Sequence, residues 1–490
     1  MIMTNALRED LPVVVIGAGP VGLAAAAHLA DRGLPFLVIE AGDQVGTAVS
    51  EWGHIHTFTP WQYIVDPTAA KLLALTGWAP PATPVPPTGA ELVEHYLCPL
   101  GQLFADRVRL GTRVLAVSRA GMDKTRSIGR AERPFILRVR EADGALGELL
   151  ARAVIDASGT WGQPNPLGAA GLPALGEQDA GPFLVGPLPD VLGQDRVRFA
   201  GRRTLVVGAG RSAANTLLNL ARLAEREPRT EILWAVRGAL PAKVYGGGAA
   251  DQLPARGQLG SDLHALVDSG AVRLVTGFSI IALEIGQDAV TVRGQTAQGP
   301  LILEGIHNLA AATGFRPDLS LLAETQLDLH PALEAPTRLA PLVDPQYHSC
   351  GTVPPHGHND LAHPDDGLYI VGMKSYGRAP TFLIATGNEQ VRSVVAALAG
   401  DLAAADEVRL VLPETGVCSV NDKGQDTAAT GGCCETPIDL EDPQVPAETH
   451  RARPAGVPAL GFATGTGGKD PLAELVITSP AGAGRCCPGA

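Results

Sequence analysis

The hydrophobic pattern begins with a short apolar run that leads directly into glycines. Residues 13–16, VVVI, are apolar and β-branched, which predicts a strand buried on both faces. GAGPVG over residues 17–22 then predicts a tight turn, and the Ala-rich stretch that continues to residue 30 predicts a helix. A second buried strand is predicted over residues 36–39, FLVI, and it ends at Glu40.

The same order of elements returns near residue 200. TLVV over residues 204–207 predicts a strand, GAGRSA over 208–213 predicts a turn, and an Ala/Leu-rich helix follows. The next predicted strand, EILWAV over 231–236, ends at Arg237 instead of an acid. Two copies of strand, glycine loop, helix and strand predict two α/β domains of the same kind.

Both glycine loops have the composition of a dinucleotide phosphate site. In the first, Gly17 allows a tight turn, Gly19 lets the backbone approach a pyrophosphate, and Gly22 lets helix and strand pack closely. The anion then meets the free N–H groups and the positive dipole at the helix N-terminus. Glu40 suits a ribose hydroxyl, whereas Arg237 suits the 2′-phosphate of NADP(H), with an ordinary surface arginine as the alternative.

Two such loops about 190 residues apart resemble the FAD- and NAD(P)-dependent flavoprotein oxidoreductases with two dinucleotide-binding domains. ARAVIDASGTW over 151–161 resembles the crossover that leaves the FAD domain, and NLAAATGFRP over 308–317 resembles its return. GLYIVG over 367–372, with ATGNEQ over 385–390, is similar to the closing FAD segment, whose helix N-terminus points at the flavin ring. The resemblance covers roughly residues 11–405.

The resemblance implies a nested α/β architecture of two Rossmann-like, three-layer domains. The FAD-binding domain is expected in residues 1–165 and 310–412, with an NADP-binding domain inserted over 166–309, and with a tail over 413–490. FAD and NADP are the cofactors that it implies.

Within that superfamily the chain is most similar to the flavin-containing monooxygenase group. FAGRRT over 199–204, the Arg211-Ser212-Ala213 segment and the spacing of Glu40 and Gly46 carry this similarity. The resemblance implies FAD contacts at Gly17, Gly19, Pro20, Gly22, Glu40, Ala41, Gly46, Trp52, Val114 and Gly159, and further cofactor contacts at Gly208, Gly210, Arg211, Ser212, Arg237, Thr313 and Gly314.

Two positions depart from the pattern of that group. Its FxGxxxH signature has no histidine in the matching window, residues 183–190, and the tryptophan expected soon after Gly46 stands at Trp52. The missing histidine favours a flavin reductase that does not oxygenate its substrate.

Candidate catalytic residues lie in the segment WGHIHTFTPWQY, residues 52–63, in a chain that is only 4% aromatic. Trp61 and Tyr63 are predicted to line the flavin and the substrate, and packing of the domain seam is the alternative. The resemblance adds Asn388, which lies in the helix that points at the flavin.

Composition narrows the range of partners. A chain of 490 residues is too long for one core, and its net charge of −13 disfavours nucleic acid or an anionic membrane. We expect a cytoplasmic enzyme that acts on a small-molecule substrate, and a homodimer is the assembly that we expect if the chain has a protein partner. Cys98 and Cys350 are the only cysteines in the first 412 residues, so a CxxC dithiol relay is excluded there.

The other five of the seven cysteines follow residue 412, where Gly, Ala, Thr and Pro predominate and disorder is predicted. They include two vicinal pairs, Cys433-Cys434 and Cys486-Cys487, which predict a site for a thiophilic ion such as As(III). The pairs are reminiscent of arsenic- and mercury-handling proteins. The alternative is a tail whose cysteines have no function.

The predicted function is an NADPH- and FAD-dependent, monooxygenase-like oxidoreductase. It passes hydride from NADPH to FAD and then electrons to O2 and a small substrate, with a role in metalloid detoxification or arsenic resistance as the further hypothesis. The alternatives are an NADPH-dependent flavin reductase without oxygenation and a thiol-based protein that binds metalloids or senses redox state.

Overall fold

The computed structural model describes residues 10–239, 245, 254–348, 353–380 and 382–410, all within one compact unit, Met1–Asp422. The predicted tail and its five cysteines lie outside the described residues. Among the helices described, none has the length and apolar character needed to cross a membrane.

The first sheet is parallel and contains strands from both ends of the described chain. Its order is β16-β7-β1-β2-β3. In the register of these strands, Ile16 lies opposite Ile39 on one side and Asp156 on the other, so the carboxyl ends of the central strands form one edge. The bounds are β1 (Val13–Ile16), β2 (Phe36–Ile39), β3 (Val108–Arg109), β7 (Ala153–Asp156) and β16 (Leu368–Ile370).

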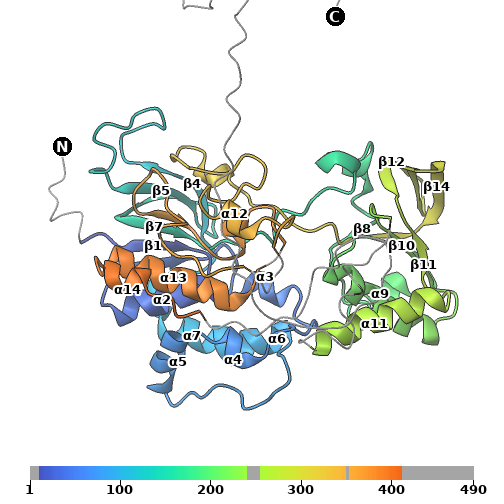
Figure 1. The fold of residues 1–490 in the computed structure, drawn as a ribbon, viewed down its shortest axis with the longest axis horizontal. Coiled ribbons are helices and arrows are strands. Elements are labelled where there is room, and N and C mark those ends of the chain that lie inside the picture. Colours follow the sequence, from blue (N-terminus) through green and yellow to red (C-terminus); the bar gives the residue numbers. More distant parts are fainter. Residues whose placement is uncertain (1–9, 240–244, 246–253, 349–352, 381, 411–490) are drawn as a thin grey trace, which may run out of the picture. The chain divides into compact units, whose positions relative to one another are not determined.

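Each face of this sheet is covered by a different layer (Figure 1). Val13 and Val15 of β1 pack with the helices α2 (Pro20–Asp31) and α13 (Ile384–Leu398). Val14 and Ile16 face the antiparallel sheet of β4 (Arg113–Arg119), β5 (Phe135–Arg140) and β6 (Leu146–Ala151). A strand that alternates between two apolar layers is apolar at every position, as its sequence VVVI is.

Short helices between β2 and β3 extend the helical layer that contains α2 and α13. Trp61 and Ile64 of this group are buried in the same core as α2. Asp66 begins the longest of these helices, because its carboxylate accepts a hydrogen bond from the amide of Ala69 and Pro67 occupies the first turn. The bounds are α3 (Thr47–Ser50), α4 (Trp61–Ile64), α5 (Pro67–Ala74), α6 (Gly89–Leu92), η1 (Val93–Leu97) and α7 (Cys98–Leu103).

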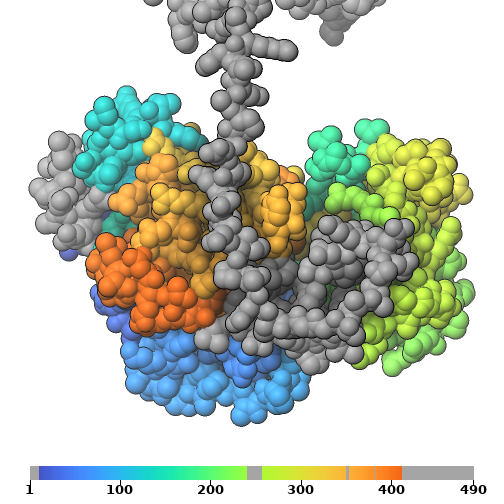
Figure 2. Space-filling view, viewed as in Figure 1, coloured from blue at the N-terminus to red at the C-terminus, as the bar shows by residue number. Residues whose placement is uncertain are grey.

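A buried charge cluster fastens the later part of this domain to the earlier part. Asp365 accepts hydrogen bonds from Arg119 Nε at 3.1 Å and from Arg130 Nε at 2.7 Å, and its side chain is fully buried. Burial alone would raise the pKa of Asp365, but the hydrogen bonds from Arg130, the Gln326 amide and Arg119 hold it below its ordinary value. In Figure 2, blue and orange atoms lie side by side over this domain, which agrees with the packing of α13 on α2.

The second domain repeats the plan. Its parallel sheet has the order β11-β10-β9-β15-β8. Val206 of β9 faces a core shared with α9 (Arg211–Arg226) and α11 (Pro254–Asp268), and Leu205 and Val207 face the antiparallel sheet of β12, β13 and β14. The bounds are β8 (Leu184–Val185), β9 (Arg203–Val207), β10 (Glu231–Ala235), β11 (Arg273–Val275), β12 (Ser279–Ile285), β13 (Val290–Thr296), β14 (Gly299–Ile306) and β15 (Asn308–Ala311).

These layers confirm the predicted α/β class with two nested three-layer domains. The inserted domain begins after β7 and ends with β15, which pairs with β8 and β9. The boundary predicted between residues 309 and 310 falls inside β15. The remaining short α-helices are α8 (Arg196–Phe199), α12 (Ala340–Val343) and α14 (Leu402–Asp406).

Candidate functional site

The first glycine loop joins β1 to α2 at the carboxyl edge of the first sheet. Gly17 has φ +99°, a left-handed conformation, and a Cβ there would lie 2.8 Å from the carbonyl oxygen of Ala157. Gly19 is the N-cap of α2, Pro20 begins the helix, and no side chain caps its first turn. A Cβ on Gly19 would meet nothing within 4 Å. An uncapped helix N-terminus that opens onto free space fits the pyrophosphate of FAD.

Glu40 lies beside this loop, at the end of β2. Its carboxylate accepts a hydrogen bond from the amide of Ala18 at 2.7 Å and another from the amide of Gly42 at 2.8 Å. Gly46, the N-cap of α3, donates its amide hydrogen bond to the Ala18 carbonyl at 3.0 Å. Glu40, Ala41 and Gly46 therefore belong to the surroundings of the first loop, and a ribose contact at Glu40 stays a prediction.

Three other predicted FAD contacts come from separate segments. Trp52 packs against α6, because a Cβ on Gly89 would lie 2.8 Å from its ring. Val114 lies in β4, opposite Val139 of β5. Gly159 follows β7 with φ +69° and open space beside it. The contacts of these three residues with FAD stay predictions.

The second glycine loop joins β9 to α9 and has similar geometry. A Cβ on Gly208 would lie 2.0 Å from the carbonyl oxygen of Ala312, whereas one on Gly210 would meet nothing within 4 Å. Gly210 is the N-cap of α9, without a side-chain cap or an acid in the first turn, and Arg211 and Ser212 follow it. The helix N-terminus therefore fits a second dinucleotide pyrophosphate.

Trp234 supports this second loop in a way that the sequence did not reveal. It lies fully buried in β10, and its indole Nε1 donates a hydrogen bond to the carbonyl of Gly208 at 2.7 Å. Arg237, just beyond the same strand, is exposed and forms no ion pair within the part of the chain that the structure describes. A guanidinium in that position is available to a 2′-phosphate.

The segment 52–63 contains both core and surface side chains. Trp61 is only 4% exposed and belongs to the core of the first domain, whereas Tyr63 is partly exposed. Asn388, in the first half of α13, donates a hydrogen bond from Nδ2 to the carbonyl of Ile64 at 3.2 Å. The three predicted catalytic residues thus lie in two helices that contact each other, α4 and α13. Their catalytic roles stay predictions.

Phe58, from the same segment, contacts the second domain. The guanidinium carbon of Arg211 lies over its ring, 5.0 Å from the centroid, and Phe58 packs against the core of that domain. A loop of the first domain therefore meets the first residue of α9. The aromatic composition of the segment was visible in the sequence, but this partner was not.

The two chain crossovers between the domains lie side by side. The amide of Asn165 donates to the carbonyl of Gly314 at 2.9 Å, and Thr313 Oγ1 donates to the carbonyl of Asn165 at 2.5 Å. The rings of Trp161 and Phe315 are 5.0 Å apart. Thr313 and Gly314 therefore join the two connections here, and their cofactor contacts stay predictions.

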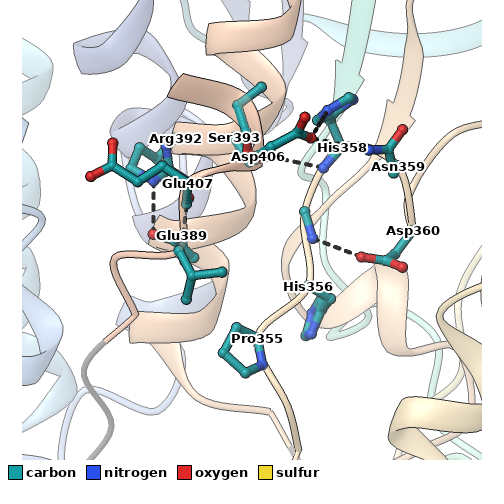
Figure 3. A pocket seen from close by; sticks show the side chains of 13 residues that line it. Pro355, His356, His358, Asn359, Asp360, Glu389, Arg392, Ser393, Asp406 and Glu407 are labelled. Atoms are coloured by element: carbon teal, nitrogen blue, oxygen red, sulfur yellow. Dashed lines mark hydrogen bonds and ion pairs between the residues drawn. The ribbon is translucent and has the colours of Figure 1, made fainter. Parts of the chain in front are cut away.

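A separate cavity of about 300 Å³ lies between the middle of α13, α14 and residues 355–360 (Figure 3). Four of its charged or titratable side chains form two pairs. Arg392 binds Glu389 with two hydrogen bonds of 2.8 and 2.9 Å, and His358 Nε2 lies 3.0 Å from Asp406 Oδ1. Two further hydrogen bonds hold α14 against α13, from Arg392 Nη1 to the carbonyl of Ala404 at 2.5 Å and from Ser393 Oγ to the carbonyl of Ala405 at 2.7 Å.

Among the residues that the structure describes, no group of three or more His, Cys, Asp and Glu side chains could hold a metal ion. The metal site predicted at Cys433, Cys434, Cys486 and Cys487 lies outside them. Cys98, in α7, is a free, partly buried thiol, and its pKa is raised by burial and, less strongly, by Glu94.

Comparison with known proteins identifies the family to which the chain is similar. Residues 14–349 match the family described as pyridine nucleotide-disulphide oxidoreductase. The chain is 30% identical over 329 residues to ferredoxin–NADP reductase from Salinispora tropica, covering 66% of this chain and 79% of that protein.

Solved structures with the same fold have lower identity. Bacillithiol disulfide reductase from Bacillus cereus gives a TM-score of 0.59 at 18% identity, covering 80% of this chain and 99% of that one. Ornithine hydroxylase from Pseudomonas aeruginosa gives 0.53 at 14% identity, covering 80% and 99%. These likenesses bear on the fold alone.

Proposed function

The chain belongs to the pyridine nucleotide-disulphide oxidoreductase family, and we propose that it works as a flavin-monooxygenase-like enzyme that uses NADPH and O2. It is an FAD-dependent NAD(P)H oxidoreductase with FAD and NADP as its cofactors, which confirms the prediction from the two glycine loops. Bound FAD accepts hydride from the nicotinamide and passes electrons to an acceptor. The identity of that acceptor is the subject of the proposal.

The residues of each domain have separate tasks in this proposal. The first loop, with Gly19 and the start of α2, binds the FAD pyrophosphate, and Glu40 orients its ribose end. The second loop binds NADPH, with Arg211 at the start of α9 and Arg237 on the 2′-phosphate. Tyr63 and Asn388 border the space for the reacting rings.

One observation carries the choice of an external acceptor. Residues 1–412 hold only Cys98 and Cys350, which do not form a CxxC pair, and burial keeps Cys98 in its thiol form by raising its pKa. Electrons from the flavin therefore have no protein dithiol in this part of the chain to reduce. O2, with a small substrate that takes up one oxygen atom, is the acceptor that we propose.

The test is the balance of NADPH, O2 and H2O2 in the purified yellow protein. Without substrate, a monooxygenase wastes its reducing equivalents as H2O2, one per NADPH oxidised. A true substrate, sought among amines, thiols and arsenite, should lower the H2O2 yield per NADPH and appear with one atom from ¹⁸O2. A panel in which no compound acquires ¹⁸O, while a protein acceptor is reduced rapidly, would contradict the proposal.

A flavin reductase without oxygenation is the second candidate. The similarity to a ferredoxin–NADP reductase and the absent histidine in residues 183–190 favour it. Reduction of cytochrome c by NADPH that depends on added ferredoxin, and that proceeds equally well without O2, would identify this activity. The same assay under air and under argon thus separates the two candidates.

A metalloid substrate is a narrower proposal, supported only by the cysteine pairs of the sequence. If Cys486 and Cys487 bind As(III), changing both to serine should weaken arsenite binding while FAD content and NADPH oxidation stay the same. A third possibility, a thiol-based sensor, predicts that NADPH oxidation is too slow to support turnover with or without arsenite. Unchanged arsenite affinity in the double serine variant would remove the metalloid proposal.

A further inference from the structure

A fully buried ion pair lies at the carboxyl edge of the first sheet. Lys374 Nζ lies 2.7 Å from Asp156 Oδ2, and neither side chain has exposed surface. Asp156 is the last residue of β7, and Lys374 lies in the 3-10 helix η7 (Gly372–Tyr376), which follows β16. Removing both ions from water costs several kcal/mol each, and apolar replacements are often as stable. Stability alone therefore gives little reason for a lysine and an aspartate here.

The pair is connected to the first glycine loop through one short segment. Lys374 Nζ also lies 3.0 Å from Ser158 Oγ, and Ser158 Oγ donates to Asp156 Oδ1 at 2.6 Å. Gly17 packs so closely on this segment that a Cβ there would lie 2.8 Å from the Ala157 carbonyl oxygen and 3.0 Å from the Ser158 Cα. Unlike the two ions beneath it, Ser158 is exposed. Residues 157–158 therefore lie between the ion pair and the phosphate loop and contact both.

The charges at this edge determine how it meets an anionic cofactor. The pyrophosphate of FAD is negative, so a lone carboxylate at Asp156 would repel it through a medium of low dielectric constant. The ammonium of Lys374 cancels that charge. Its field also reaches Asp318, whose pKa is lowered first by a hydrogen bond from Ser320 and further by Lys374 and Arg113.

We propose that Lys374 is a positioning residue for FAD. By pairing with Asp156, Lys374 makes the carboxyl edge beside the glycine loop neutral toward the pyrophosphate. Asp156 in turn fixes Ser158 and the backbone against which Gly17 packs. The carboxylate is thus needed for the shape of the loop, and the lysine is needed to make that carboxylate compatible with FAD. This inference rests on FAD binding and does not depend on the electron acceptor.

Substitution of Lys374 should therefore weaken FAD binding, whereas substitution of Asp156 should not. Lys374→Met leaves the carboxylate unpaired and should raise the Kd for FAD about tenfold or more, the effect of one added charge at short range. Asp156→Asn leaves the cation in place and keeps an amide oxygen that can accept the hydrogen bonds from Ser158, so the loop keeps its shape and the Kd should stay the same or fall. The double variant should return to within about threefold of the wild type, because the net charge is again zero.

The measurement is release of FAD from the purified holoenzyme after dilution, followed by flavin fluorescence. Lys71→Met is the matched control, because Lys71 Nζ also lies 2.7 Å from a carboxylate, that of Asp31, but on the exposed surface. It should leave the Kd unchanged.

Equal weakening of FAD binding in Lys374→Met and Asp156→Asn, with equal losses of thermal stability in the FAD-free proteins, would overturn the proposal in favour of a purely structural pair. If Lys374→Met does not fold, Lys374→Arg and Asp156→Asn still test it. Lys374→Arg keeps the charge and should keep FAD, and a tenfold loss of affinity in Asp156→Asn would contradict the sign that we expect.

Discussion

Replacing Gly19 by alanine should separate FAD binding from folding. The residue has φ −79° and ψ −174°, which alanine adopts without strain, and the added methyl group meets no protein atom within 4 Å. Alanine is a poorer N-cap than glycine by about 0.5–1 kcal/mol, but it also restricts the unfolded chain, which stabilises by about 0.4–1 kcal/mol. The two effects oppose each other, so the free energy of unfolding of the FAD-free protein should change by less than about 1 kcal/mol.

The same methyl group occupies the space into which the pyrophosphate must come. Backbone N–H groups bind phosphate oxygens at about 2.9 Å, which leaves no room for a methyl group between them. Crowding of this kind costs about 1–3 kcal/mol, so the Kd for FAD should rise by roughly 5- to 150-fold. Loss of bound FAD should therefore occur in a protein that is otherwise folded.

The assay compares flavin content and the Kd for FAD with thermal unfolding of the FAD-free proteins, because bound FAD itself raises the melting temperature. Gly22→Ala is the contrasting variant. A Cβ there would lie 2.0 Å from the carbonyl oxygen of Gly17, so it should destabilise even the FAD-free protein. A Gly19→Ala protein with wild-type FAD affinity, or one as unstable as Gly22→Ala, would refute the assignment of the loop.

Four further predictions concern the second cofactor and stability. Arg237→Ala should raise KM for NADPH about tenfold but leave KM for NADH unchanged in steady-state kinetics, because a charge-assisted contact with the 2′-phosphate is lost; equal changes for both would exclude this role. Phe58→Leu should raise KM for NADPH about two- to fivefold at full FAD content, since Arg211 loses its stacking contact with the ring; unchanged kinetics would make the contact incidental. Asp365→Asn should lower the free energy of unfolding in urea by about 3–5 kcal/mol, because two buried guanidinium groups lose their shared carboxylate; a loss below about 1 kcal/mol would contradict this. Burial lowers the pKa of His363 from 6.5 to about 4, so stability should fall as the pH drops through that interval, where the unfolded chain binds a proton that the folded one does not. His363→Gln should flatten this part of the pH profile.

The glycine loops and their surroundings could be predicted because their chemistry is contiguous. Val13–Ile16, the loop and the helix up to Asp31 form one strand–loop–helix unit of neighbouring residues. The hydrogen bond that places the Glu40 carboxylate on the Ala18 amide spans only 22 residues. Sequence order and local backbone preferences are sufficient for such a unit, and the repeat at residues 204–236 predicted the second domain in the same way.

The sequence could not predict which aromatic side chains of the segment 52–63 are buried. Trp61 and Tyr63 are both aromatic and two residues apart, yet one is in the core and the other is partly exposed. Which of them faces the interior depends on α13, which lies more than 300 residues later and binds the carbonyl of Ile64 through Asn388. The sequence pattern marked the segment but could not assign its side chains to core or surface.

By itself the sequence determined the two α/β domains and the two glycine loops, because strand period and glycine spacing are local properties, and the resemblance to the flavoprotein oxidoreductases implied their nesting. Only the tertiary structure decided which side chains that are distant in the sequence contact each other. Lys374 and Asp156 are 218 residues apart, and Phe58 contacts Arg211 of the other domain. Such pairs arise because parallel strands and inserted domains bring remote segments to one edge. Their energy depends on burial and distance, which the whole fold sets.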